Sequence, residues 1–271
     1  MRDIIFGGRT LIMGVINVTP DSFYSASRIR KTQDAVQRVF EFERTGADIV
    51  DIGGISTRPG AGEIPVEEEL NRVVPVIEEI RKRSALLISV DTYRPQVAEE
   101  ALAKGADIIN NISGLRYDNG LGQVVQRTGS YIILMHMRGK PASMQELAVY
   151  ENVVEDVSRE LDESIERALN AGIEKTKIIL DPGIGFAKKA EHNLLLIKHL
   201  PRIRQKGFPI LVGLSRKSFL GAFTGLPVEQ RLIPTVVANA ISIFQGADII
   251  RVHDVEEAKI TVQIADAIRN S

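Results

Sequence analysis

The sequence predicts an α/β protein of the (β/α)8 TIM-barrel class, built as a single domain over residues 1–271. Three observations predict this fold. Eight short apolar runs recur along the chain, helical patterns lie between most of them, and the length of 271 residues is close to the roughly 250 typical of the class. Because the runs are almost continuously apolar, each is typical of a parallel strand that is buried on both faces.

The eight runs are the strands that we expect, and almost every one stops at a polar residue. In a barrel of this class the carboxyl ends of the strands share one face, and the active site forms there. We therefore expect the polar residues at the ends of the runs to meet. The runs read LIMGVIN (11–17), DIVDIGG (48–54), LLISVD (86–91), DIINN (107–111), YIILMH (131–136), IILDPG (178–183), ILVGLSRK (210–217) and IIRVHD (249–254).

Apolar residues at helical spacing predict the helices between the strands. Gly46 follows the first helix as its expected C′ residue, and Pro95 stands at the expected N1 position of the third. Pro75 lies inside the second pattern and should kink that helix or make it start afresh. The predicted helices cover residues 32–45, 66–83, 95–104, 151–171, 190–206, 228–245 and 255–268.

A short repeat, Gly-Ala-Asp followed by a strand, occurs three times and ends in Asp48, Asp107 and Asp248. Each copy closes a helix with glycine and begins the next strand. The aspartates are therefore expected at the amino ends of the strands, which serve the stability of a barrel and not its chemistry.

Composition narrows the class of protein. The net charge is −1 and there is no cysteine, so disulfides and zinc–thiolate sites are excluded and nothing favours nucleic acid as a partner. The first residues lack the apolar core of a signal peptide, and the longest weakly polar stretch, 235–244, is too short to span a membrane. We expect a soluble cytoplasmic protein.

Three long connections, 17–31, 53–65 and 136–151, are candidates for lids and binding loops.

Cations gather at the ends of the last two predicted strands. Lys217 follows the seventh strand, and Arg251 and His253 end the eighth with the period-2 spacing that points both side chains the same way. Barrels often bind phosphate at this place, and Asn17 of the adjacent first strand could complete the anion site or bind Mg²⁺ through its amide oxygen. The alternative is a surface cluster of salt bridges.

Two carboxylates, Asp91 and Asp181, end the third and sixth strands. With Asn110 and Lys217 they offer the donors and acceptors that a flat heterocycle with a guanidine-like edge requires, because a carboxylate accepts two parallel N–H bonds from such an edge. Phe186 could stack on the ring. The alternative is that each aspartate only caps the helix that follows.

The remaining candidates for chemistry are weaker. His136 ends the fifth strand between two methionines, so a packed, hydrogen-bonded role and a functional one both stay open. His192 and His199 are expected to serve surface or helix packing. The chain has no zinc-like spacing and no convincing Ser-His-Asp arrangement, so we expect a site that works by positioning and electrostatics.

The motifs at the strand ends resemble those of the dihydropteroate synthase family, in order and over the whole chain. The resemblance implies a TIM-barrel transferase of folate biosynthesis that joins 6-hydroxymethyl-7,8-dihydropterin diphosphate to p-aminobenzoate and releases diphosphate. The matching segments are 13–23 (MGVINVTPDSF), 51–54 (DIGG), 56–60 (STRPG), 89–92 (SVDT), 134–137 (LMHM), 181–183 (DPG), 215–218 (SRKS) and 251–254 (RVHD).

The resemblance also implies residue roles, Mg²⁺ as cofactor and a homodimer. Asp91, Lys217, Arg251 and His253 would be catalytic. The pterin would be bound by Asp91, Asn110, Asp181, Lys217 and Phe186. The diphosphate would be bound by Asn17, Arg251 and His253, with Asn17 holding the metal. The p-aminobenzoate would be framed by Phe23, Thr57, Arg58, Pro59 and Ser218, together with Phe186.

Three departures from the family pattern lie near the expected site. The stretch Tyr24-Ser25-Ala26-Ser27 replaces Ser-Asp-Gly-Gly, Ile55 replaces glutamate, and Asn111 replaces aspartate. They bear on the first loop and on Mg²⁺ more than on the pterin pocket. Two other hypotheses stay open: a pterin-binding protein without turnover, and a corrinoid-linked methyltransferase, whose family lacks the SRKS and RVH motifs present here.

Overall fold

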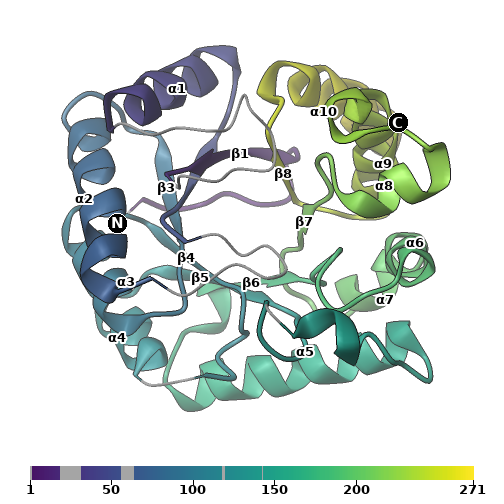
Figure 1. The fold of residues 1–271 in the computed structure, drawn as a ribbon, viewed down its shortest axis with the longest axis horizontal. Helices are drawn as coiled ribbons and strands as arrows, with labels where there is room; N and C mark the ends of the chain where they lie inside the picture. The colour runs from purple at the N-terminus through teal and green to yellow at the C-terminus, as the bar shows by residue number, and fades with distance from the viewer. Residues whose placement is uncertain (1, 19–31, 56–63, 118–119, 142) are drawn as a thin grey trace.

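The eight predicted strands are confirmed in a computed structural model, which describes residues 2–18, 32–55, 64–117, 120–141 and 143–271. Figure 1 shows the strands in the middle of the molecule and the helices around them. Each strand lies within its predicted run. The strands are β1 Leu11–Asn17, β2 Ile49–Gly53, β3 Leu87–Asp91, β4 Ile108–Asn111, β5 Tyr131–Met135, β6 Ile178–Asp181, β7 Leu211–Gly213 and β8 Ile249–Val252.

All paired strands are parallel, in the order β6-β5-β4-β3-β2-β1-β8-β7. A single bridge between Leu180 and Ile210 joins the two outer strands of this order, and the N–H of Leu180 donates to the carbonyl of Pro209 at 2.9 Å. The sheet is thereby a nearly closed barrel, as the TIM-barrel class requires.

Helices cover the outside of the barrel, and most agree with the sequence prediction. The prediction of one helix over 190–206 is wrong, because the segment divides into two helices at His199. Pro201 lies in the first turn of the second helix and has no N–H with which the first helix could continue. Helix α2 does not start afresh at Pro75. The helices α4 and α8 were not predicted. The helices are α1 Thr32–Thr45, α2 Val66–Arg81, α3 Pro95–Ala103, α4 Leu121–Thr128, α5 Val153–Asn170, α6 Ala190–Lys198, α7 Leu200–Arg204, α8 Ser218–Thr224, α9 Leu232–Phe244 and α10 Val255–Arg269, with short 3-10 turns at Met144–Leu147, Lys175–Lys177 and Val228–Gln230.

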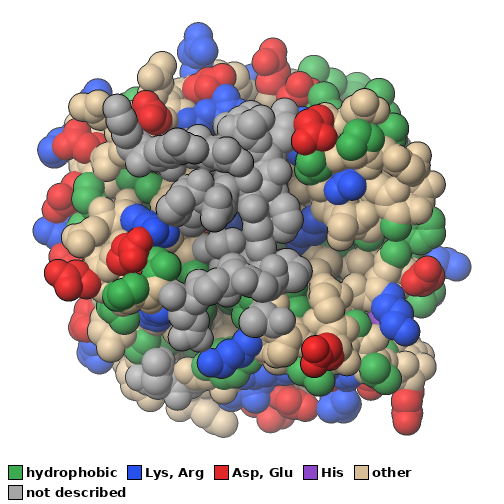
Figure 2. Space-filling view, viewed as in Figure 1, with side chains coloured by type: hydrophobic (Ala, Val, Ile, Leu, Met, Phe, Trp, Pro, Cys, Tyr) green, Lys and Arg blue, Asp and Glu red, His purple; other side chains and the backbone are tan. Residues whose placement is uncertain are grey.

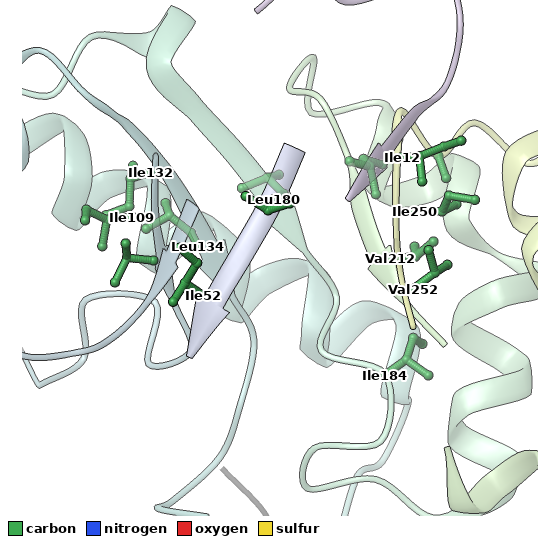
Figure 3. Close-up of a cluster of buried hydrophobic side chains, with 14 of the residues drawn as sticks. Ile12, Ile52, Ile109, Ile132, Leu134, Leu180, Ile184, Val212, Ile250 and Val252 are labelled. Carbon is green, nitrogen blue, oxygen red and sulfur yellow. The ribbon is translucent and has the colours of Figure 1, made fainter. Parts of the chain in front are cut away.

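Two apolar layers hold the barrel together. The larger one lies between the sheet and the helices, and Figure 3 shows part of it, with side chains such as Ile52, Ile109 and Ile250 coming from different strands. The smaller one includes Met13, Ile133 and other residues that alternate with the first set along the strands. Since successive side chains of a strand point to opposite faces, this smaller cluster fills the inside of the barrel.

The even-numbered strands share one interior pattern. Each contributes an isoleucine to the inner cluster, and these are Ile49, Ile108, Ile179 and Ile249. Two positions later, on the same face, each strand carries a polar residue: Asp51, Asn110, Asp181 and Arg251. Barrels of this class stack interior side chains in layers of four from alternate strands. The polar layer therefore lies directly above an apolar floor.

The three Gly-Ala-Asp aspartates have the structural role that the sequence predicts. Asp48 accepts from the backbone N–H of Ile12 at 2.9 Å, Asp107 from that of Ile88 at 3.0 Å, and Asp248 from that of Ile210 at 2.8 Å. Each is also paired with an arginine, namely Arg9, Arg81 and Arg204. The aspartates thus tie neighbouring strands together at the amino end of the barrel.

Charges of both signs are interspersed on the face shown in Figure 2, in keeping with the net charge of −1. Among the described residues, no helix combines the length and the apolar character that a membrane crossing needs.

Candidate active site

Three members of the polar layer are joined by hydrogen bonds at the carboxyl end of the barrel. The Nδ2 group of Asn110 donates to Oδ2 of Asp51 at 3.1 Å, and Nε of Arg251 donates to the same oxygen at 2.7 Å. Asp51 is completely buried. The prediction that polar strand ends meet at one place therefore holds, and Asp51 lies at the centre of the group.

Asp91 lies beside this group at the end of β3. The Nη2 group of Arg251 reaches Oδ2 of Asp91 at 3.5 Å, longer than its contact with Asp51. Burial, followed by the negative charge of Asp51, raises the pKa of Asp91 to about 7, and Arg251 opposes the shift. Asp91 can therefore change its charge near neutral pH, and it can accept hydrogen bonds from a ligand in its ionised form.

Neither candidate carboxylate caps the helix that follows its strand, so that alternative is wrong. Helix α3 has Arg94 at its N-cap, and α6 has Lys189. Asp181 instead accepts from the backbone N–H of Gly183 through Oδ1 at 2.7 Å. Burial raises the pKa of Asp181, and Lys217 opposes the shift. Neither aspartate is therefore used as a helix cap.

The segment after β6 passes close over β5 and carries the aromatic ring that we predicted. Gly183 has a φ of +66°, and a Cβ there would lie 1.9 Å from the carbonyl oxygen of His136, so only glycine fits. The amine of Lys217 donates to the carbonyl of Ile184 and lies 4.8 Å from the centre of the Phe186 ring. Lys217 and Phe186, both predicted to bind the heterocycle, are thus neighbours.

Lys217 is held in a setting that disfavours its charge. Burial lowers the pKa of its amine to about 8, and Asp181 opposes this shift. It is the N-cap residue of α8, directly before Ser218. A lysine that is protonated at pH 7 and partly desolvated is a strong donor for a polar ligand.

The cations after β7 and β8 have different partners inside the protein. Arg216 makes two 2.9 Å bonds to Asp254, so the salt-bridge alternative holds for this residue. His253 contacts Oγ of Ser215 through Nδ1 at 2.9 Å, and burial together with the charge of Arg251 lowers its pKa to about 4. His253 is therefore neutral at pH 7. Arg251 keeps its charge, because Asp51 and Asp91 raise its pKa against the effect of burial.

His136 is packed and hydrogen-bonded inside the protein. Its Nε2 lies 3.1 Å from Oε2 of Glu160, and its Nδ1 lies 2.9 Å from the amine of Lys188. Lys188 also donates to the carbonyl of Phe186 at 2.9 Å. Burial, and next the charge of Lys188, lower the pKa of His136 to about 3, so the ring is neutral. The network supports the segment that carries Phe186.

The predicted ligand for a metal, Asn17, is the last residue of β1 and lies opposite Gly53 of β2. No group of three or more histidine, aspartate or glutamate side chains that could hold a metal occurs among the described residues. Four predicted contacts of p-aminobenzoate lie outside the described residues, namely Phe23, Thr57, Arg58 and Pro59. Ser218 is the first residue of α8.

Two residues of this network, Asp51 and Lys188, were given no site role from the sequence, although Asp51 was noted at the end of its run. A signal for Asp51 was present, since it interrupts an apolar run two positions after Ile49. For Lys188 no local signal exists, because its partner His136 lies 52 positions away. Among the described residues, Oδ1 of Asp51, Oδ1 of Asn110 and Oγ of Ser89 are buried without a hydrogen-bond partner. Such atoms are costly, and they indicate a surface that is built to accept N–H groups.

Comparison with known proteins agrees with this geometry. Residues 13–253 match the family model described as pterin binding enzyme. The dihydropteroate synthase of Escherichia coli is 43% identical over 256 residues, covering 94% of this chain and 90% of its own. That of Synechocystis is 41% identical over 264 residues, covering 97% and 91%.

Solved structures of dihydropteroate synthases have the same fold. The Yersinia pestis enzyme with a sulfonamide drug superposes with a TM-score of 0.94 at 40% identity, covering 99% of both chains. The Xanthomonas albilineans enzyme with 4-aminobenzoic acid gives 0.90 at 41% identity, covering 97% and 94%. The Coxiella burnetii enzyme with pteroic acid gives 0.90 at 36% identity, covering 98% and 95%.

Proposed function

Because the chain belongs to the pterin-binding enzyme family, we infer that it is a dihydropteroate synthase. It is a transferase of folate biosynthesis, and it joins 6-hydroxymethyl-7,8-dihydropterin diphosphate to p-aminobenzoate with release of diphosphate. The observation that carries this conclusion is the polar layer of Asp51, Asn110, Asp181 and Arg251 above an apolar floor. Such a layer offers acceptors and a cation to a flat, polar ring at the mouth of the barrel.

We assign the heterocycle to Asp91, Asn110, Asp181 and Lys217. The two carboxylates lie on β3 and β6. Asn110 lies on β4 between them, and its Oδ1 has no hydrogen-bond partner within the part of the chain that the structure describes. Asp181 suits the guanidine-like edge of a pterin, since a carboxylate accepts two parallel N–H bonds. Phe186, next to Lys217, supplies an aromatic face for stacking.

We assign the diphosphate to Arg251 and His253, with Asn17 nearby. The guanidinium of Arg251 stays charged, and a neutral imidazole can donate one hydrogen bond to a phosphate oxygen. Asn17 offers a single amide oxygen, which suits Mg²⁺ only if the substrate's phosphates supply further ligands, as Mg²⁺ sites commonly do. When bound, Mg²⁺ would neutralise charge on the leaving diphosphate.

The residues account for the reaction without a strong general base. The bond that breaks joins the exocyclic methylene of the pterin to a diphosphate oxygen, and the electron pair leaves with the diphosphate. Arg251 and His253 stabilise that charge, while an ionised Asp91 stabilises positive charge that develops on the pterin. The attacking arylamine is neutral at pH 7 and loses its proton after the new carbon–nitrogen bond forms. Phe23, Thr57, Arg58, Pro59 and Ser218 remain the predicted contacts of p-aminobenzoate.

We also propose that the protein is a cytoplasmic homodimer that associates through α9 and α10. Their outer faces carry large apolar side chains that are about half to three-quarters exposed, and a contiguous exposed apolar face marks an interaction site. These are Ile233, Val237, Ile241 and Phe244 on α9 and Ile260, Ile264 and Ile268 on α10. Light scattering should give twice the monomer mass for the wild type and the monomer mass for Ile264→Asp. A monomeric wild type would contradict the proposal.

An assay of diphosphate release tests the proposed activity. We expect release, and formation of 7,8-dihydropteroate, only when both the pterin diphosphate and p-aminobenzoate are present. Release at the same rate without the amine, or no release at all, would refute the assignment. Tight pterin binding without turnover would instead identify a binding protein.

A further inference from the structure

The Gly-Ala-Asp repeat continues for three more residues and ends inside the active site. Its copies read GADIVD (46–51), GADIIN (105–110) and GADIIR (246–251). The third residue of each copy ties strands together at the amino end of the barrel. The sixth residue is the position at which all three copies differ, and it supplies Asp51, Asn110 and Arg251. The same six-residue pattern therefore places a carboxylate, an amide and a guanidinium at one level of the barrel.

The three groups form a single unit with Asp51 in the middle. Oδ2 of Asp51 accepts from Asn110 at 3.1 Å and from Arg251 at 2.7 Å. A completely buried carboxylate must be compensated by donors or by charge. Arg251 supplies the charge, and Asn110 supplies a second donor.

We propose that Asp51 is a positioning residue that orients the Asn110 amide and the Arg251 guanidinium toward the pterin diphosphate. This proposal rests on the proposed function of the same site and adds to it. Asp51 lies at the same level of the barrel as Asn110 and Arg251 and acts through them.

For Asn110 the orientation follows from hydrogen-bond chemistry. A side-chain amide has a donor end and an acceptor end, and its neighbours decide which end faces a ligand. A carboxylate only accepts, so Asp51 must receive the Nδ2 end. The Oδ1 end is then left for another donor, and it is buried without a partner among the described residues. Asn110 is thereby fixed as an acceptor for a ring N–H.

For Arg251 the two contacts differ in strength. Nε lies 2.7 Å from Asp51, whereas Nη2 lies 3.5 Å from Asp91, which is at the limit of a hydrogen bond. A ligand that contacts Asp91 can replace the weak contact without releasing the strong one. Asp51 therefore holds the guanidinium in place while the substrate binds.

The same copy of the repeat, residues 46–51, offers a matched control for the experiment. Asp51→Asn and Asp48→Asn each remove one carboxylate charge. Asp51 lies in β2 at the active site, and Asp48 directly precedes β2 at the amino end of the barrel. Calorimetry with 6-hydroxymethylpterin should show binding about tenfold weaker for Asp51→Asn, the worth of one misdirected hydrogen bond. Binding to Asp48→Asn should stay within about twofold of wild type.

Turnover separates positioning from general damage to the fold. In Asp51→Asn the KM for the pterin diphosphate should rise about tenfold and kcat should fall, because Arg251 is also displaced, while the KM for p-aminobenzoate stays unchanged. If the wild type binds the pterin and Asp51→Asn binds it equally well, the positioning role is wrong. If the wild type itself does not bind it, the proposed site fails instead.

A measurement on the wild type decides the matter if Asp51→Asn does not fold. In ¹⁵N-labelled protein, the side-chain NH2 signal of Asn110 can be identified by its absence in Asn110→Ser. We expect no nuclear Overhauser contact between this NH2 group and bound 6-hydroxymethylpterin, because the group faces Asp51. A direct contact would mean that the amide presents its nitrogen to the ligand and would overturn the proposal.

Discussion

Strands β2, β4 and β8 each begin beside an aspartate and carry a second polar residue three positions later, and the two positions have opposite properties. At the amino end, Asp48, Asp107 and Asp248 each have an arginine and a backbone N–H as partners. At the carboxyl end, Asp51 and Asn110 each keep a buried oxygen without a partner among the described residues. In β2 and β4 the same short sequence therefore carries one polar residue with all its partners and one with an unpaired oxygen, whereas Arg251 of β8 has Asp51 and Asp91 as partners.

The carboxyl end of the barrel also holds charged groups whose burial lowers the stability of the folded protein. Burial disfavours the charges of Asp91 and Lys217, shifting their pKa values to about 7 and about 8. Each shift is free energy that a ligand can recover by binding to the charged form. Substitutions at the two ends should thus have opposite signatures: loss of stability alone at the amino end, and loss of binding or turnover at the carboxyl end.

The largest effect is expected for Arg251→Ala. It removes the cation assigned to the diphosphate and leaves Asp51 and Asp91 without it, so kcat should fall on the order of 10²–10³-fold. Steady-state diphosphate release measures this. Arg204→Ala, which removes the arginine of Asp248 at the amino end, should leave kcat unchanged. A kcat for Arg251→Ala within about twofold of wild type would remove the residue from the diphosphate site.

The next effect is one of stability. Asp107→Ala removes the acceptor of the Ile88 N–H, a buried bond, and the partner of Arg81, a part-buried one. The free energy of unfolding in urea should fall by about 3 kcal/mol, while both KM values stay unchanged. A shift of the pterin KM with unaltered stability would contradict the division between the two ends.

A smaller effect is expected for Asp181→Asn. The amide can still accept the Gly183 N–H, but it replaces a charged pair of acceptors with one acceptor and one donor. The dissociation constant of 6-hydroxymethylpterin should rise about 10- to 100-fold in calorimetry. Unchanged affinity would exclude Asp181 from contact with the pterin.

The smallest effect concerns Lys217 and depends on pH. Its folded pKa of about 8 lies below the ordinary value, so the unfolded chain binds more protons between about pH 8 and 10.5, and stability rises with pH across this window. Lys217→Met should therefore be more stable than wild type by about 1–3 kcal/mol at pH 7, with most of this gain lost by pH 10.5. Urea unfolding at both pH values measures it. A variant less stable than wild type at pH 7 would show that the buried charge is well compensated.

The strands could be predicted from the sequence because burial on both faces leaves a local mark, an unbroken apolar run. The same holds for α1, whose predicted range of 32–45 is its observed one. The helices α4 and α8 have only eight and seven residues, which give too few turns for a clear periodic pattern. The division of the predicted helix 190–206 at His199 follows from Pro201. Pro201 can be read from the sequence, but the apolar residues continue at helical spacing across it and favoured one helix.

Most residues of the site could be predicted from the sequence, but the hydrogen bonds between them could be predicted only in part. Asp91, Asn110, Asp181 and Lys217 were found because each follows an apolar run. The contact between Arg251 and Asp51 joins residues 200 positions apart and exists only because the barrel closes. The sequence spacing predicts that Arg251 and His253 point the same way. The structure adds two partners of Arg251 inside the barrel, Asp51 and Asp91.

The most direct test of this account is a crystal structure of the protein with 7,8-dihydropteroate bound. We predict that the pterin ring lies on the polar layer, with N–H groups donating to Asp181 and to Oδ1 of Asn110, and with Lys217 at its edge. Arg251 should keep its bond to Asp51 in that complex. A pterin bound elsewhere, or one that leaves Asp181 and Asn110 without contact, would contradict the account.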